Sequence, residues 1–224
     1  MLHIIATPIG NLEDITLRSL RILKEVDGII CEDTRHTGIL LSRYEIKKPM
    51  TVLNDYNESR TVEVIIAKLK SGENLALVSD AGTPLISDPG YKLVRECIKE
   101  GIEVDSLPGP SSVIAALTLS GMPPDKFMFL GFPPDKIGHR QELFKNLKGI
   151  NDIVKTTFVF FVAPFKLVKT LQELEAALGS DIHITLAKEL TKIHQEVKTM
   201  SVSDWQIEFS RKYPKGEWVM IVNI

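Results

Sequence analysis

The sequence predicts an α/β fold made of two domains, with a parallel sheet in the first. Short apolar runs of strand length alternate with segments of helical periodicity along the 224 residues. In the first half, four of these runs end in loops of small or charged residues, and after Gly121 the pattern changes. Parallel strands need long crossover connections, so this alternation favours a parallel sheet covered by helices. We expect an N-terminal α/β domain over residues 1–112 and a C-terminal α/β domain over 113–224.

The strands expected in the first half are short apolar runs, each bounded by turn residues. They cover 2–6, 28–31, 51–53, 75–78 and 104–107. Apolar residues repeat with helical spacing between these runs, and the expected helices cover 15–26, 39–44, 60–69 and 91–99. Asp14 is the expected cap of the first helix, and Ser71-Gly72 is the expected end of the third.

In the second half, proline pairs at 123–124 and 133–134 bracket a short strand over 127–130 and mark the entry to the second domain. The further strands are expected over 157–162, 183–187 and 218–222. The expected helices cover 139–147, a segment that ends at 178, and 202–212. We find no internal repeat and no low-complexity linker.

Composition sets limits on the function. With 44% hydrophobic and 25% charged residues, the chain can bury a core. Its net charge of −2 gives no global attraction to nucleic acid, so any RNA contact must come from a local patch. Cys31 and Cys97 lack metal-ligand spacing and are interpreted as reduced thiols. No signal peptide and no apolar run of membrane-spanning length are found, so we expect a soluble, cytoplasmic protein.

The segment 75–90, LALVSDAGTPLISDPG, is the strongest candidate for a binding loop. Its strand leads into Ala81-Gly82-Thr83-Pro84, whose small side chains let backbone groups approach a ligand closely. In open α/β sheets, ligands bind at this carboxyl edge of the strands. Two ordinary turns would have the same composition, and that alternative stays open.

Three polar clusters follow other strand ends. Glu32, Asp33 and Arg35 could orient a hydroxyl group or transfer a proton, or they could cap the strand end and form a surface ion pair. Residues 57–60 could form a second polar wall or a helix N-cap. Residues 188–192 could bind a substrate or form a solvated helix start.

Several enzyme classes are excluded by the motifs that the sequence lacks. No G-x-G-x-x-G follows a strand, and no Walker A loop is present. The sequence also contains no H-E-x-x-H and no G-x-S-x-G. The five histidines have no ligand spacing, so we expect no metal.

Six motifs occur in an order that resembles a known family. They are ATPIGN at 6–11, EDTRHT at 32–37, VSDAGTPLISDPGY at 78–91, LPGPSS at 107–112, SGMP at 120–123 and KELTK at 188–192. Together they resemble the bacterial 16S ribosomal RNA (cytidine-2′-O)-methyltransferase branch of the tetrapyrrole (corrin/porphyrin) methylase family, over nearly the whole chain.

The resemblance implies two α/β domains, with a parallel sheet in the first and a mixed sheet in the second. It implies S-adenosylmethionine (SAM) as the cofactor, bound in the cleft between the domains. It also implies a homodimer that methylates the ribose 2′-hydroxyl of a cytidine in the decoding region of 16S rRNA, with the small ribosomal subunit as its partner.

Three sets of site residues follow from these motif positions. Those that match the cofactor contacts of the family are Pro8, Asp80, Ala81, Gly82, Pro84, Ile86, Ser111, Ser112, Phe161, Val162 and Ala187. The acids expected to act as the base or to orient the hydroxyl are Glu32, Asp33 and Glu58. The candidates for contacts with the RNA are Arg35, Asn57, Arg60, Lys188 and Lys192.

One motif departs from the family pattern. Relatives usually carry Tyr-Glu-Ser-x-His-Arg after the apolar strand of the second domain, whereas residues 161–166 are FVAPFK and lack the Glu, His and Arg. The departure concerns the substrate more than the cofactor. Two alternatives therefore stay open: a methylase of a tetrapyrrole or another small acceptor, and a SAM-binding ribosome-assembly protein without turnover.

Overall fold

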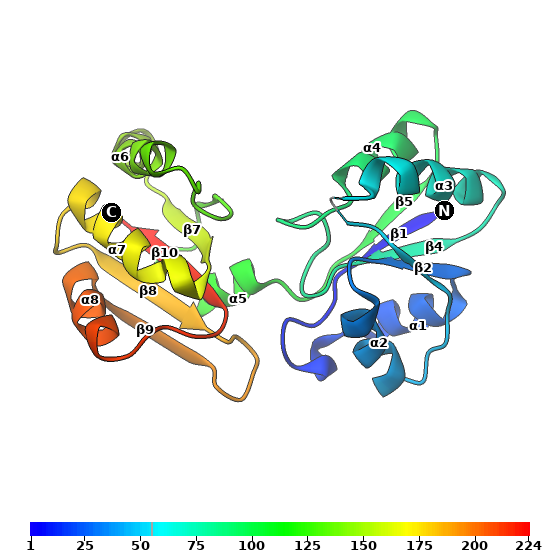
Figure 1. Ribbon diagram of the computed structural model, residues 1–224, viewed down its shortest axis with the longest axis horizontal. Helices are drawn as coiled ribbons and strands as arrows, with labels where there is room; N and C mark the ends of the chain where they lie inside the picture. The colour runs from blue at the N-terminus through cyan, green and yellow to red at the C-terminus, as the bar shows by residue number, and fades with distance from the viewer. Residues whose placement is uncertain (55) are drawn as a thin grey trace. The chain divides into compact units, whose positions relative to one another are not determined.

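The computed structural model describes residues 1–54 and 56–224. The chain forms two compact units, Met1–Ser111 and Ser112–Ile224 (Figure 1). This division lies one residue before the expected boundary between residues 112 and 113, and the assignment of the two units as domains stays a prediction. Among the described residues, no helix is both long and apolar enough to cross a bilayer.

The first unit is built on a five-stranded, fully parallel sheet, which confirms the expected architecture. Its strands are β1 (Leu2–Ile5), β2 (Gly28–Cys31), β3 (Met50–Val52), β4 (Leu75–Val78) and β5 (Val104–Leu107). They lie in the order β3-β2-β4-β1-β5. The register places Ile4 of β1 between Leu77 of β4 and Ser106 of β5. Every residue of β1, β2 and β4 is buried, as expected for strands covered on both faces.

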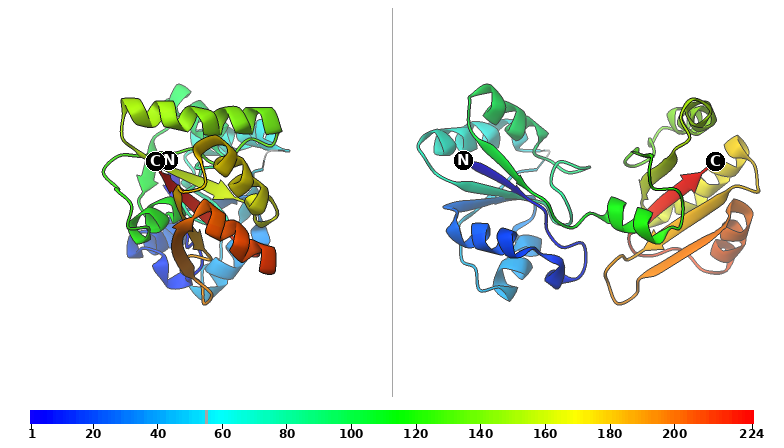
Figure 2. Two further views of the ribbon diagram at one scale, coloured as in Figure 1. Left: turned by 90° about the vertical axis from the view of Figure 1, so that its left-hand side faces the viewer. Right: turned by 180° about the vertical axis from the view of Figure 1, so that it is seen from behind.

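Helices cover both faces of this sheet. They are α1 (Leu17–Glu25), α2 (Thr34–Arg43), α3 (Glu58–Lys70) and α4 (Tyr91–Lys99), with a 3₁₀ turn η1 (Leu12–Asp14) before α1. Helices α1 and α2 lie on one face, and α3 and α4 lie on the other (Figures 1 and 2). Right-handed crossovers place helices on opposite faces when the chain reverses its direction across the sheet, and the strand order contains such a reversal.

Capping side chains decide where two of these helices begin. Helix α1 is capped by Thr16, whose hydroxyl accepts a hydrogen bond from the Ser19 N–H at 3.0 Å, and not by Asp14 as expected. Helix α2 starts well before the expected helix, because the Asp33 carboxylate accepts a hydrogen bond from the Arg35 N–H at 2.8 Å. The polar cluster after β2 is therefore a helix N-terminus.

The second unit contains a mixed five-stranded sheet, as the family resemblance implies. Its strands are β6 (Phe127–Phe129), β7 (Thr157–Val162), β8 (His183–Lys188), β9 (Glu196–Ser201) and β10 (Trp218–Asn223). They lie in the order β6-β7-β10-β8-β9, with β6 and β7 parallel and the other pairs antiparallel. The sequence does not predict β9, since this edge strand is polar and partly exposed. Residues 189–192 lie in the connection between β8 and β9 rather than at a helix start.

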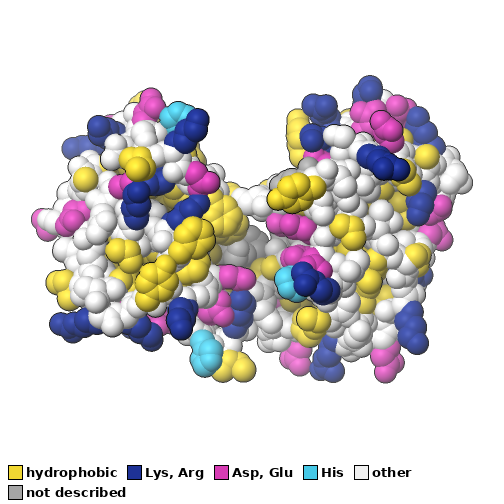
Figure 3. Space-filling model, in the orientation of Figure 1, with side chains coloured by type: hydrophobic (Ala, Val, Ile, Leu, Met, Phe, Trp, Pro, Cys, Tyr) yellow, Lys and Arg dark blue, Asp and Glu magenta, His cyan; other side chains and the backbone are white. Residues whose placement is uncertain are grey.

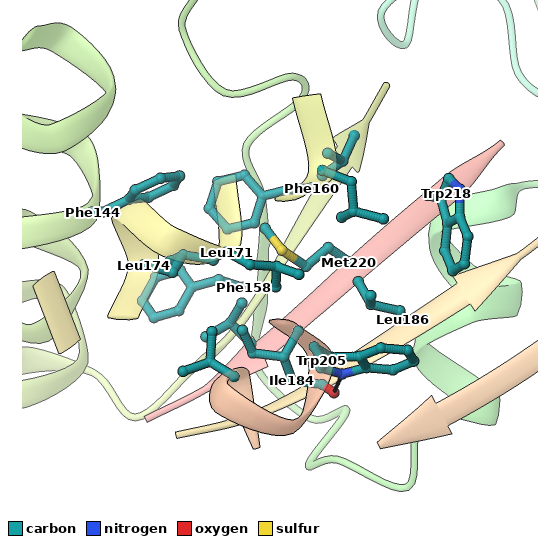
Figure 4. Close-up of a cluster of buried hydrophobic side chains, with 14 of the residues drawn as sticks. Phe144, Phe158, Phe160, Leu171, Leu174, Ile184, Leu186, Trp205, Trp218 and Met220 are labelled. Atoms are coloured by element: carbon teal, nitrogen blue, oxygen red, sulfur yellow. Dashed lines mark hydrogen bonds between the residues drawn. The ribbon is translucent and has the colours of Figure 1, made fainter. Parts of the chain in front are cut away.

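The second unit contains the helices α5 (Ser112–Leu119), α6 (Ile137–Ile153), α7 (Pro164–Leu178) and α8 (Val202–Arg211). The last three pack on one hydrophobic core. Apolar side chains from α6, α7 and α8 meet those of β7, β8 and β10 in one cluster (Figure 4). Phe144 and Phe160 meet edge to face at 6.0 Å, and the Trp205 indole N–H donates to the Ile184 carbonyl at 2.9 Å. Since side chains alternate along a strand, Phe161 projects from the other face of the sheet.

Candidate active site

The loop after β4 is tied to the loops after β1 and β5. Thr7 and Gly82 exchange two backbone hydrogen bonds with N–O distances of 2.8 and 3.0 Å. The Thr7 hydroxyl donates to the carbonyl of Ser79, and the Ser79 hydroxyl donates to the carbonyl of Gly82, both at 3.0 Å. The Thr83 hydroxyl donates to the carbonyl of Pro110 at 3.3 Å. Three strand ends are thereby joined around the segment that the sequence selects as a binding loop.

The same loop holds its backbone in a left-handed conformation at four positions. Two are glycines, Gly82 (φ +83°) and Gly90 (φ +119°), and two are not, Leu85 (φ +73°) and Ser87 (φ +64°). For a residue with a side chain, this conformation costs about 1–2 kcal/mol. Such strain persists only where the surrounding structure fixes it, and it is typical of ligand-binding loops.

The strand order places a topological switch point at this edge of the sheet. Strand β4 lies between β1 and β2. The chain leaves β4 toward the face covered by α4, whereas it leaves β1 and β2 toward the face covered by α1 and α2. Loops that diverge on either side of one strand define the switch point at which open α/β sheets bind ligands.

Asp80 connects this loop to the N-terminus of α2. One of its carboxylate oxygens accepts a hydrogen bond from the Asp33 N–H at 3.2 Å, and the other lies 2.8 Å from Nδ1 of His36. The hydrogen bond with Asp80 raises the pKa of His36 above its ordinary value of 6.5. Asp33 itself is engaged by Arg35, whose side-chain and backbone hydrogen bonds lower the pKa of Asp33 to about 2. Arg35 and His36 are exposed to solvent.

Asp88 is a residue of this edge that the sequence analysis did not select. Burial, together with the charges of Glu32 and Asp80, raises the pKa of Asp88 to about 6. These three acids therefore share one electrostatic environment at the carboxyl ends of β2 and β4. The second turn of the segment, which contains Asp88-Pro89-Gly90, was the available sequence signal, but the proximity to Glu32 exists only in the folded chain.

Glu58, predicted as a catalytic acid, is a buried ion-pair partner of α4. Its carboxylate lies 2.8 Å from Nζ of Lys92 and accepts a hydrogen bond from the Gly90 N–H at 3.4 Å. Burial would raise the pKa of Glu58, but the hydrogen bonds from Lys92 and Gly90 outweigh burial and lower the pKa. The Asn57 side chain closes its own loop, with Nδ2 donating to the Val52 carbonyl at 3.0 Å. These contacts hold the start of two helices in place.

The three residues predicted to cover the cofactor from the second unit lie close together in its sheet. Val219 in the central strand β10 pairs with Phe161 on one side and with Ala187 on the other. Phe161 is partly exposed and lies in an aromatic group with Phe129 and Phe132, at ring distances of 4.8 and 5.5 Å. Val162 is 3% exposed and belongs to the hydrophobic core, so only its backbone is available to a ligand.

The lysines predicted to contact the substrate are both engaged within the second unit. Nζ of Lys188 lies 5.6 Å from the ring centre of Trp218. Nζ of Lys192 lies 3.2 Å from the carboxylate of Glu189 and 2.9 Å from that of Glu217. Glu189 is in a left-handed conformation with φ +48°, which marks this connection as a second strained segment.

The predicted site residues are divided between the two units. The first-unit group consists of Pro8, Glu32, Asp33, Arg35, Asn57, Glu58, Arg60, Asp80, Ala81, Gly82, Pro84, Ile86 and Ser111. The second-unit group consists of Ser112, Phe161, Val162, Ala187, Lys188 and Lys192. On the face shown in Figure 3, basic and acidic side chains are interspersed, without a continuous basic field. Within residues 1–54 and 56–224, no group of three or more His, Cys, Asp or Glu side chains could hold a metal ion.

The architecture, with a parallel sheet in the first unit and a mixed sheet in the second, is a fold that other solved structures share. Among solved structures, the chain is similar to a cobalt precorrin-4 methyltransferase, with a TM-score of 0.73 and 17% identity over 99% of this chain and 94% of that one. It is also similar to a diphthine synthase, with a TM-score of 0.77 and 16% identity over 99% of this chain and 89% of that one. At this level of identity the similarity establishes the fold alone.

The chain belongs to the tetrapyrrole (corrin/porphyrin) methylase family, whose family model matches residues 1–206. It is 46% identical over 222 residues to the ribosomal RNA small subunit methyltransferase I of Thermotoga maritima, covering 99% of this chain and 97% of that protein. It is 44% identical over 225 residues to the protein of the same name from Haemophilus influenzae, covering 99% of this chain and 78% of that protein. These findings confirm the family that the sequence motifs indicate.

Proposed function

We propose that the protein is a SAM-dependent methyltransferase that methylates the 2′-hydroxyl of a cytidine ribose in the decoding region of 16S rRNA. The proposal is supported by the name shared by relatives at 41–46% identity along the chain and by the six motifs. The single observation in the structure that best supports it is the loop 79–90, held by Thr7 at the switch point of a parallel sheet.

The chemistry of this edge suits a cationic methyl donor. The sulfonium group of SAM is positively charged, and Glu32, Asp80 and Asp88 supply a negative potential at the strand ends. Gly82 leaves its own backbone uncovered by a side chain, and its φ of +83° is a conformation that favours glycine. A phosphate-rich cofactor would instead need a glycine-rich cradle at a helix N-terminus, which the sequence lacks.

We assign the contacts with SAM to residues of both units. They are Pro8, Asp80, Ala81, Gly82, Pro84, Ile86, Ser111, Ser112, Phe161, Val162 and Ala187. Bound SAM supplies an activated methyl group on a good leaving group. The residues of the chain must then align the acceptor hydroxyl with that group and remove the hydroxyl proton.

The three acids predicted to remove the hydroxyl proton differ in their ion-pair partners and in the effect of those partners on their pKa. A base must have a pKa near the working pH. Asp33 has a pKa of about 2 and is bound by Arg35, and Glu58 is bound by Lys92. Both are better suited to holding α2 and α4 in place. We therefore propose Glu32 as the acid that orients the acceptor hydroxyl.

Contacts with the RNA are proposed for exposed or partly exposed groups. Arg35, Asn57, Arg60, Lys188 and Lys192 are the candidates from motif position. Arginine and lysine side chains bind phosphate oxygens without reading sequence. We therefore propose that the enzyme selects its nucleotide by the shape of the rRNA in the assembled small subunit. A homodimer in the cytoplasm completes the proposal, on family resemblance alone.

A second candidate is a protein that binds SAM without catalysing rRNA methylation. It is favoured by residues 161–166, where the Glu, His and Arg of the family motif are absent and Lys166 pairs with Asp135. A third is methylation of a tetrapyrrole or another small acceptor, which the family description favours.

One assay separates the three candidates. Purified protein is incubated with methyl-labelled SAM and, separately, with undermethylated small ribosomal subunits, protein-free 16S rRNA and a porphyrin precursor, while SAM binding is measured by calorimetry. Label in the subunits supports the preferred function. Label in the porphyrin precursor supports the third candidate. SAM binding without transfer to any acceptor supports the second.

A further inference from the structure

We propose that His36 accepts the proton of the acceptor hydroxyl and that Asp80 positions it for this step. The proposal rests on the proposed methyltransferase function and adds the residue that carries the proton. His36 belongs to none of the residue sets that the sequence motifs assign to the cofactor, to the acids or to the RNA.

The geometry fixes both the orientation and the tautomer of the ring. Nδ1 of His36 lies 2.8 Å from one carboxylate oxygen of Asp80, and the other oxygen accepts the Asp33 N–H at 3.2 Å. A neutral imidazole that donates from Nδ1 carries its free electron pair on Nε2. The His36 side chain is 60% exposed, so Nε2 can reach a substrate. A carboxylate orients a histidine base in the same way in enzymes whose base activates a nucleophilic hydroxyl.

The position of the pair in the fold supports a catalytic role. Asp80 follows β4, and His36 lies in the first turn of α2 after β2, so the pair spans two neighbouring strand ends at the switch point. Asp80 is also the first residue of the segment that we assign to SAM. The base and the methyl donor would therefore meet at one loop, as an in-line transfer requires.

The charged groups that face His36 act in different directions. Asp80 and Asp33 favour the imidazolium form, and Arg35 opposes it. The net effect raises the pKa of His36, with the hydrogen bond to Asp80 as the largest cause. The neutral, proton-accepting form is therefore present above this raised pKa, and the rate of transfer falls as the pH drops through it.

The transfer forms one bond to the methyl carbon and breaks another. The acceptor oxygen forms a bond to the methyl carbon, and the carbon–sulfur bond breaks with its electron pair going to sulfur. The hydroxyl proton moves to Nε2 of His36, which becomes imidazolium and returns the proton to water. No further reactant is needed.

The decisive variant is His36→Gln, with His139→Gln as the matched control, because His139 is an exposed histidine of α6 in the second unit. On methylatable subunits we expect His36→Gln to lower kcat about 100-fold or more at pH 7.5, which is the range of a lost general base. The SAM affinity of His36→Gln should stay within twofold of that of the control. Its thermal midpoint should equal that of the control within experimental error. Added imidazole should restore part of the lost rate.

A second readout does not depend on turnover. The ring proton resonance of His36 is identified by its absence in His36→Gln, and its titration is followed by NMR in the wild type and in Asp80→Asn. We expect the wild-type pKa to match the acid limb of the pH–kcat profile. We expect Asp80→Asn to move the pKa of His36 down toward its ordinary value.

Three results would overturn the proposal. The first is full activity of His36→Gln. The second is a loss of rate in His36→Gln that is matched by an equal loss of SAM affinity. The third is an acid limb of the pH–kcat profile that disappears in Asp88→Asn and persists in His36→Gln. If the wild type methylates no acceptor, the proposed function fails, and an unchanged His36 pKa in Asp80→Asn would then overturn the pairing independently.

Discussion

Thr7 and Gly82 are joined by two backbone hydrogen bonds of 2.8 and 3.0 Å, although 75 positions separate them in the sequence (82 − 7). The bridge fixes the loop after β4 against the loop after β1. Both loops belong to motifs that the sequence analysis selected, and neither motif alone indicates the pairing. In our account this bridge presents the backbone of residues 80–84 to the methyl donor.

Replacing Gly82 by alanine should lower SAM affinity at least tenfold. Its φ of +83° is unfavourable for a side chain, and the new Cβ would lie 3.4 Å from Ile9. Gly72→Ala is the matched control, because Gly72 has φ +98° and no atom within 4 Å of the new Cβ, at the exposed end of α3. Both variants should lose about 1–2 kcal/mol of stability, but only Gly82→Ala should lose calorimetric SAM binding. Equal SAM affinity in the two would contradict the role of this loop.

Glu58→Gln should destabilise the first unit at neutral pH by about 1–2 kcal/mol, as expected for a lost hydrogen bond to a charged group. Because the folded pKa of Glu58 is lowered below 4.5, its contribution is complete above the unfolded pKa and is lost as the pH falls through the folded pKa. The difference in urea-unfolding free energy between wild type and variant should therefore shrink in acid. Glu63→Gln, at an exposed position of the same helix, is the control for loss of a carboxylate away from Lys92. A difference that is constant from pH 7 to pH 3 would rule out the ion pair with Lys92 as the cause.

Asp88 should titrate with a midpoint near pH 6, because burial and the charges of Glu32 and Asp80 raise its pKa to about 6. The charged form is disfavoured in the fold, so the wild type loses stability as the pH rises from about 4 to 6. Asp88→Asn removes this loss and should be more stable than the wild type above pH 6. Carboxyl carbon NMR shifts and thermal midpoints at pH 4 and pH 7 check both statements. A titration midpoint of Asp88 near pH 4 would contradict the proposed effect of burial and of the charges of Glu32 and Asp80.

The buried pair of Arg140 and Glu173 should be a stability element of the second unit. Two guanidinium nitrogens face the Glu173 carboxylate, and Arg140 also donates to the carbonyl of Pro134 at 2.7 Å. Arg140→Met leaves a buried, unpaired carboxylate and should cost about 3 kcal/mol. The double variant Arg140→Met/Glu173→Leu should recover much of this loss.

Denaturant titration of both variants measures the effect, with Lys99→Met as the control. Lys99 forms a surface pair with Glu96, and its loss should leave the unfolding midpoint unchanged. An equal loss of stability in Arg140→Met and in the double variant would show that packing, and not the unpaired charge, is the cause.

Local pattern was sufficient to predict most elements of the fold. The bounds of β4 and α4 match the prediction because Gly, Ser and Pro turns enclose both elements. The start of α2 was not predicted, because Asp33 was interpreted as a catalytic acid or a strand-end cap, and its role as a helix cap depends on the backbone of Arg35. The edge strand β9 was missed because it forms by pairing with β8, and its own pattern is weak.

The candidate site was predicted in part for the same physical reason. The sequence analysis placed Asp80, Gly82 and Glu58 after strand ends, but their partners lie far away in the sequence. The ion pair of Glu58 with Lys92 and the hydrogen bond of Asp80 with His36 exist only once the strands are ordered in the sheet. His36 and Asp88 were therefore not selected, although each is contained in a motif that was.

The most direct test of the account is nucleotide mapping of small ribosomal subunits after reaction with this protein and methyl-labelled SAM. The subunits must come from a strain that lacks the modification, and the labelled nucleoside is identified by mass spectrometry of the digested 16S rRNA. We predict one label, on the ribose 2′-oxygen of a cytidine in the decoding region. Label on a base or another nucleotide, or no label despite calorimetric SAM binding, would contradict the account.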